Sequence, residues 1–244
     1  MAKLAPPPGR RALLVVAGAA LAPSLVAAAI AGFLVAGIGG RLAMFILRVT
    51  SGDRVVGLES DDGFVIGRFT ADTFALVLGL TVGGMIVAGP VYAVARLWFP
   101  PRWRPPIFAS FFGVFGGAVL VHADGIDFTL LSPRMLAVAL FVAIPAAFGA
   151  VLEPLHELAR DQTQKLPEAA LLVVAVLTSV SLIVIGPPGI VLAVLGWIAV
   201  LLGQGERISR ALRSRALAWA GRAGFAGIAV LAIVDLARDL QALL

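Results

Sequence analysis

Residues 50–72, TSGDRVVGLESDDGFVIGRFTAD, form the one long polar stretch in an otherwise apolar sequence. Their centre, Asp61-Asp62-Gly63, is typical of a three-residue hairpin loop with glycine in the left-handed conformation. A loop there would set Leu58 opposite Ile66, with β-patterned residues on both sides. The stretch therefore predicts a small β-hairpin inserted between two apolar runs.

The composition around this insert is that of a membrane protein. Hydrophobic residues make up 60% of the chain and charged residues only 14%, against about 45–50% and about 25% in soluble domains. The chain has no cysteine, which excludes disulfides, thiolate metal sites and a cysteine nucleophile. We expect a single polytopic membrane domain covering residues 1–244, with the hairpin insert at 50–72.

Seven apolar runs have the length, or nearly the length, needed to cross about 30 Å of hydrocarbon. The glycine cluster at 37–40 is expected to break or bend the first of them, leaving 41–49 as a short interfacial helix. The predicted fold is an all-α integral membrane protein of about seven transmembrane helices, with the hairpin between helices 1 and 2. The predicted spans are about 12–36, 73–95, 105–123, 133–152, 169–186, 189–203 and 216–234.

The distribution of lysine and arginine predicts the orientation. With seven spans and the N-terminus inside, most of these residues fall in loops on the cytoplasmic side, as the positive-inside rule requires. The hairpin and the C-terminus then face outward. The richness in Ala, Gly, Val and Arg suggests the plasma (inner) membrane of a high-GC bacterium. Because the basic residues are spread over several short loops, membrane topology explains the net charge of +5 better than nucleic-acid binding does.

The predicted spans carry little chemistry. Their polar side chains are mainly hydroxyls, and no Asp, Glu, Lys or His lies near a span centre. Proton relays and ion-coupled transporters usually need ionisable groups there. The sequence accordingly predicts no catalytic residue, no metal site and no cofactor.

Charged residues gather instead in the insert and in the loop after the third predicted span. Arginines there could bind an anionic group, and the carboxylates with a histidine could hold a divalent cation. The simpler interpretation, in which these charges solvate a hairpin and neutralise one another, is favoured. Arg41 stands out because it follows the glycine cluster near the hydrocarbon edge. The candidate ligand-binding residues are Arg41, Arg48, Glu59, Asp61, Asp62, Arg68, His122, Asp124 and Asp127.

An ExxHE arrangement, made by Glu153, His156 and Glu157, follows the fourth predicted span. Residues three and four apart share a helix face, so this arrangement could contribute to a metal site. A di-iron bundle site would need a second such motif, which the sequence lacks, and Pro154 interrupts this one. We interpret the arrangement as a charged helix end.

Small residues recur four apart in several spans, as in Gly79–Gly83 and Gly113–Gly117, and allow helices to approach closely. The favoured hypothesis is a non-enzymatic accessory, assembly or partner-binding subunit. It would contact membrane lipids and pack against a protein partner or a second copy through these stripes. One alternative is a small transporter or channel with an outward-facing charged site. The other is an enzyme acting on a lipid-linked substrate at the outer interface.

Overall fold

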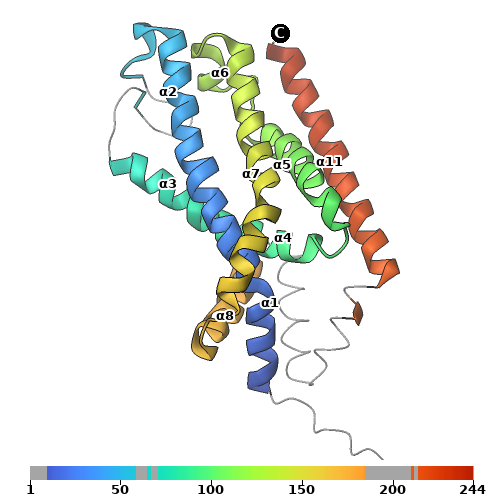
Figure 1. Ribbon diagram of the computed structural model, residues 1–244. Helices are drawn as coiled ribbons and strands as arrows, with labels where there is room; N and C mark the ends of the chain where they lie inside the picture. Colours follow the sequence, from blue (N-terminus) through green and yellow to red (C-terminus); the bar gives the residue numbers. More distant parts are fainter. Residues whose placement is uncertain (1–9, 59–64, 67–70, 185–209, 212–213, 244) are drawn as a thin grey trace, which may run out of the picture.

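The protein is an all-α bundle in the computed structural model, which describes residues 10–58, 65–66, 71–184, 210–211 and 214–243. Four of its helices are long and apolar enough to cross a membrane (Figure 1). Helix length and composition are therefore those of an integral membrane protein. The four helical stretches are Arg11–Ser51, Ala71–Ala95, Arg134–Thr163 and Arg215–Leu243.

The helices follow the predicted apolar runs closely, although seven spans are not confirmed. Both α5 and α8 are apolar but only 17 residues long, and the predicted span at 189–203 lies outside the described residues. The elements are α1 (Arg10–Ala31), η1 (Gly32–Gly39), α2 (Gly40–Ser51), η2 (Asp53–Val55), α3 (Ala71–Gly83), η3 (Gly84–Ala88), α4 (Gly89–Ala95), η4 (Pro101–Trp103), α5 (Arg104–Leu120), α6 (Ile126–Leu130), α7 (Arg134–Thr163), α8 (Glu168–Val184) and α11 (Arg215–Leu243).

The predicted break at the glycine cluster is wrong, because α1, η1 and α2 form one continuous helix. The glycines are accommodated by η1, a π-helical segment with wider turns. The backbone of α3 packs directly against this segment, because a Cβ on Gly32 would lie 2.5 Å from the carbonyl oxygen of Leu80. Residues 41–49 are accordingly part of a long helix and not a separate interfacial one.

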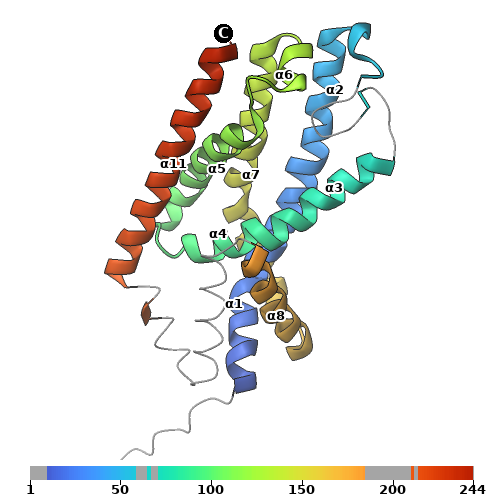
Figure 2. The ribbon, with the colours of Figure 1, turned by 180° about the vertical axis from the view of Figure 1, so that it is seen from behind.

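Close helix approaches hold the bundle together at small residues. A Cβ on Gly113 of α5 would lie 2.9 Å from the Cβ of Ala146 on α7. A Cβ on Gly149 of α7 would collide with the carbonyl oxygen of Phe108. The Gly113–Gly117 stripe is therefore used for packing within the chain. Figure 2 shows α3 crossing the bundle obliquely, with its N-terminal end projecting away from the other helices.

The predicted β-hairpin is not confirmed, since the described residues contain no strands. The structure does show a turn at residues 55–58, with Gly57 at φ +87° and a hydrogen bond from Leu58 N to Val55 O of 3.3 Å. Gly57 N donates to Ile66 O, and Ile66 N donates to Leu58 O, as in a glycine-containing β-bulge. The predicted loop at Asp61-Asp62-Gly63 lies outside the described residues.

We call residues 51–58, 65–66 and 121–133 the insert end of the bundle. Val55 and Ile66 are buried there in one core cluster with Val121, Phe128 and Leu131. Because these apolar side chains are buried in a core cluster, the described part of the polar insert has a defined conformation.

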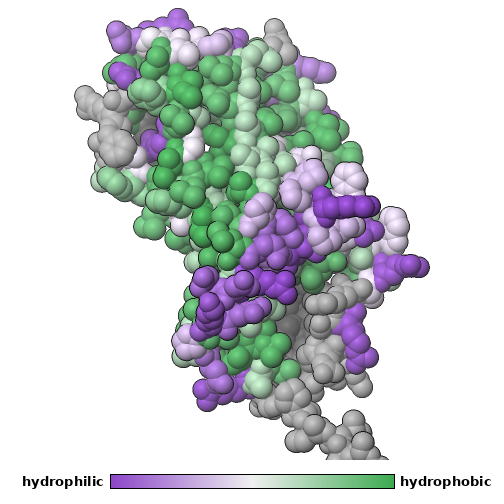
Figure 3. All heavy atoms as spheres, viewed as in Figure 1, coloured by the Kyte–Doolittle hydropathy of each residue, from purple (hydrophilic) through white to green (hydrophobic). Residues whose placement is uncertain are grey.

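Hydrophilic residues form a second feature, a band across the molecule between a larger and a smaller apolar region (Figure 3). On α7, Arg134, which directly follows the insert end, and Glu153 are 19 residues apart, which corresponds to about 28 Å of helix. This is close to the thickness of the bilayer's hydrocarbon core. Glu153 and the insert end therefore suit opposite boundaries of a membrane.

Candidate functional site

We call seven neighbouring, hydrogen-bonded residues the polar cluster: Ser24, Tyr92, Arg96, Arg104, Glu153, His156 and Glu157. They come from α1, α4, the segment after α4, the start of α5 and the second half of α7. The two arginines flank a loop whose prolines end one helix and begin the next. Elements far apart in sequence thus bring their charges to one depth in the bundle.

Glu153 is the centre of the polar cluster. Its Oε1 accepts hydrogen bonds from Arg104 Nη1 at 2.6 Å and from Arg96 Nη2 at 3.1 Å. Its Oε2 accepts from the hydroxyl of Tyr92 and, at 3.4 Å, from Arg96 Nε. The Glu153 side chain is only 10% exposed, so these contacts replace the water that the carboxylate has lost. Every oxygen of the carboxylate is engaged.

Arg96 joins Glu153 to the edge of the polar cluster. Its Nη2 also lies 3.0 Å from Oε1 of Glu157, a half-exposed residue that in turn faces Arg160 Nη1 at 3.6 Å. Burial alone would lower the pKa of Arg96, but its hydrogen bonds to Glu153 outweigh burial and raise that pKa above its ordinary value. The guanidinium therefore stays charged.

His156 extends the polar cluster to the first helix. Its Nδ1 is hydrogen-bonded to Oγ of Ser24 at 3.0 Å, and both residues are buried. The ring also lies edge-on to Tyr92, with centroids 6.0 Å apart. Through these contacts the polar cluster links α1, α4 and α7.

This arrangement is better suited to holding helices than to chemistry. A carboxylate that accepts four hydrogen bonds has no free position for a proton or a metal ion. In the described part of the chain, no three His, Cys, Asp or Glu side chains are grouped so that they could hold a metal ion. The polar cluster instead joins three helices by charge-assisted bonds inside a region of low polarity.

Five of the nine predicted ligand-binding residues are described, two on α2 and three at the insert end. Arg41 and Arg48 lie half-buried on α2, and two nitrogens of Arg41 are shielded from solvent. His122 and Asp124 are exposed in the segment between α5 and α6, and Asp127 lies on α6. The other four predicted residues lie outside the described residues: Glu59, Asp61, Asp62 and Arg68.

Sequence reasoning missed the polar cluster, because it interpreted Glu153, His156 and Glu157 as a solvated helix end. In the structure α7 continues through Pro154 to Thr163, and both Glu153 and His156 are buried. A signal was present: the predicted topology places the loop after the second span and the end of the fourth span on the same side. A carboxylate at one helix end and arginines at the other would then face each other.

Comparison of the chain with family models, with curated proteins and with solved structures finds no match. Its function must therefore be argued from its own residues.

Proposed function

We propose that this chain is a non-enzymatic membrane subunit that packs against a helix of another polypeptide. The observation that carries the proposal is the open surface of α3 around Gly79 and Gly83. A Cβ on either glycine would meet no atom of the described residues within 4 Å. By contrast, the glycines of α5 and α7 are in contact with neighbouring helices.

The position of α3 supports this proposal. The helix leaves the bundle at an angle (Figure 2), and only 11% of an apolar 18-residue stretch within Ala71–Ala95, the helical run to which α3 belongs, is buried within the chain. Leu78, next to the first glycine, is 64% exposed. Two glycines four residues apart let the backbone of a second helix approach closely, which is how helices associate in lipid.

The nature of the polar cluster also favours a binding role over an enzymatic one. An enzyme needs a nucleophile, an acid or a base that is free to act on a substrate. Glu153, the most central carboxylate of the polar cluster, is instead fully hydrogen-bonded by Tyr92, Arg96 and Arg104.

The test is to replace both glycines of α3, as Gly79→Leu with Gly83→Leu. We expect the chain to fold, because the new side chains enter open space, and to lose its partner or its self-association. The measurement is the mass of the detergent-solubilised complex by light scattering, together with crosslinking in the membrane. Gly224→Leu on α11 is the matched control, since that position is also open. An unchanged mass and crosslinking pattern in the α3 variant would contradict the proposal.

One observation favours transport as a second candidate function. Two π-helical segments, η1 and η3, lie in adjacent helices and contact the same region of α1 and α3. A Cβ on Gly84 of η3 would lie 2.7 Å from the carbonyl oxygen of Ala28. Irregular helices at mid-membrane depth can expose backbone groups to a substrate. Uptake by proteoliposomes that contain the purified chain would distinguish this role from partner binding.

A further inference from the structure

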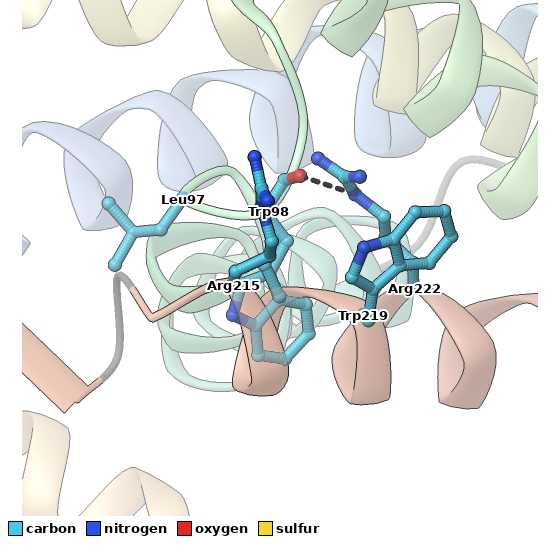
Figure 4. Close-up of a pocket in the computed structure, with 6 residues that line it drawn as sticks. Leu97, Trp98, Arg215, Trp219 and Arg222 are labelled. Carbon is cyan, nitrogen blue, oxygen red and sulfur yellow. Dashed lines mark hydrogen bonds between the residues drawn. The ribbon is translucent and has the colours of Figure 1, made fainter.

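A groove of about 660 Å³ lies where α11 begins, beside the segment that joins α4 to α5 (Figure 4). It lies next to the polar cluster along the chain but shares no residue with it. Two arginines and two tryptophans form most of its wall, and none of the described residues that line it is a carboxylate. The lining residues are Leu97, Trp98, Arg215, Ala218, Trp219 and Arg222.

The α11 side of the groove follows from helix periodicity. Arg215, Trp219 and Arg222 are spaced by four and three residues, so they lie on one face of the helix. Gly221 lets this helix approach the other wall, because a Cβ there would collide with the ring of Trp98.

Arg222 is held in place on that face. Its Nε donates to the carbonyl oxygen of Trp98 at 2.7 Å. Its Cζ lies 5.4 Å from the ring centre of Trp219 and 6.0 Å from that of Phe99. Among the described residues, these contacts fix the guanidinium while using only one of its nitrogens, which leaves the other two for a ligand.

The positive charge of the groove is not neutralised by the nearby polar cluster. Glu153 and Glu157 lie close in sequence to each other and are bound to Arg96 and Arg104. Across the described ranges, no ion pair within 4.0 Å joins a carboxylate to either arginine of the groove. The groove therefore favours an anion.

The other wall carries an unused hydrogen-bond donor. Nε1 of Trp98 is shielded from solvent and has no hydrogen-bond partner within the described part of the chain. A buried N–H without an acceptor costs free energy. An acceptor oxygen could reach this donor only after the indole shifts, because less than 1 Å² of the nitrogen is exposed.

We propose that this groove binds the phosphate-bearing headgroup of an anionic phospholipid. Guanidinium groups bind phosphate oxygens in pairs, and tryptophan side chains are typical of the depth at which headgroups meet hydrocarbon. Basic pockets between membrane helices suit such headgroups. Leu97, Ala218 and the tryptophan rings supply apolar contacts for the glycerol and upper acyl chain, which a free phosphate would not use. The inference does not depend on the proposed partner-binding role.

The test is native mass spectrometry of the full-length chain in detergent, titrated with phosphatidylglycerol or with phosphatidylcholine of the same acyl chains. We expect the anionic lipid to bind more tightly. Arg215→Gln should weaken that binding about fivefold, the effect of one basic residue near an anionic surface. Arg238→Gln, at the far end of the same helix and equally exposed, is the matched control and should bind like the unaltered chain.

Arg222→Gln should weaken binding further, with folding checked because this side chain also holds the carbonyl of Trp98. Because Arg215 has no hydrogen-bonding role within the groove, its variant remains informative if the other fails to fold. Equal binding of the two lipids, or equal effects of Arg215→Gln and Arg238→Gln, would overturn the proposal. Complete competition by millimolar inorganic phosphate would also overturn it and would assign the groove to free phosphate instead.

Discussion

The insert end and the polar cluster both contain charged and hydroxyl-bearing side chains, but the charged groups are largely exposed at the insert end and buried in the polar cluster. At the insert end, Arg54, His122 and Asp124 are exposed, and water can solvate their charges. In the polar cluster, Arg96 and Arg104 are no more than 16% exposed and meet at Glu153. A charge near water needs no partner, whereas a charge withdrawn from water must be paired. Local charge density alone therefore does not identify the energetically important region.

The largest expected effect is that of Glu153→Ala. This substitution leaves two arginines and the hydroxyl of Tyr92 without their shared acceptor, which should cost about 3–5 kcal/mol. The measurement is thermal or denaturant unfolding in detergent. Glu157→Ala, whose side chain is 48% exposed, is the control and should cost less than about 1 kcal/mol. Similar losses for the two variants would remove the distinction between a buried and a solvated carboxylate.

Ser24→Ala should have the next largest effect within the polar cluster. It removes the only bond between His156 and α1 that the described residues show, and leaves a buried ring nitrogen unsatisfied, at about 1–3 kcal/mol. Beside the insert end, Thr50→Ala is the comparison, because Thr50 is exposed at the end of α2 and its Oγ1 donates to the carbonyl oxygen of Ile46 at 3.1 Å. Unfolding should show the smaller loss for Thr50→Ala, since water can replace the hydroxyl there. The reverse order would mean that burial does not decide these energies.

Sequence patterns predicted the helices far better than the site, and the reason is physical. A helix such as α7 is specified by a continuous apolar run, which can be recognised locally. The polar cluster depends on Arg96 and Arg104 meeting Glu153, a residue 57 and 49 positions further along the chain. Such pairing depends on how helices pack, and no local pattern encodes it. The one hint available from the sequence was that the predicted topology places both segments on the same side of the membrane.

At the glycine cluster, 37–40, a local pattern was present but led to the wrong prediction. Glycine favours a break in an isolated helix because it loses most backbone freedom on folding. Here neighbouring residues lie so close to Gly32 and Gly37 that a Cβ on either glycine would collide with them. The close packing that glycine allows stabilises the helix, which continues. The insert differs again: its predicted loop at 61–63 lies outside the described residues, and the structure shows a turn and bulge around Gly57 where strands were expected.

Two arginines of the α2–η2 region allow a comparison near the insert end. Two nitrogens of Arg41 are shielded from solvent, whereas Arg54 is exposed and donates to Ser132 Oγ at 2.8 Å. Interactions of a shielded guanidinium are stronger than those of an exposed one. We therefore expect Arg41→Ala to lower stability by roughly 1–2 kcal/mol more than Arg54→Ala. A thermal-shift assay of both variants measures the difference, and equal shifts would contradict it.

The substitution with the smallest expected effect tests whether the insert has a defined backbone conformation. Gly57→Ala places a side chain at φ +87°, where an L-residue costs about 1 kcal/mol, although a Cβ there would meet no atom of the described residues within 4 Å. We expect faster tryptic cleavage at Arg54, because the turn and its bonds to Ile66 open more often. Gly40→Ala is the control: its surroundings are equally open, but its φ of −60° is helical, so alanine should be neutral or stabilising there. If both variants are cleaved at the rate of the unaltered chain, the insert end lacks the defined turn. The contrast with the polar cluster would then be one between an ordered and an unspecified region.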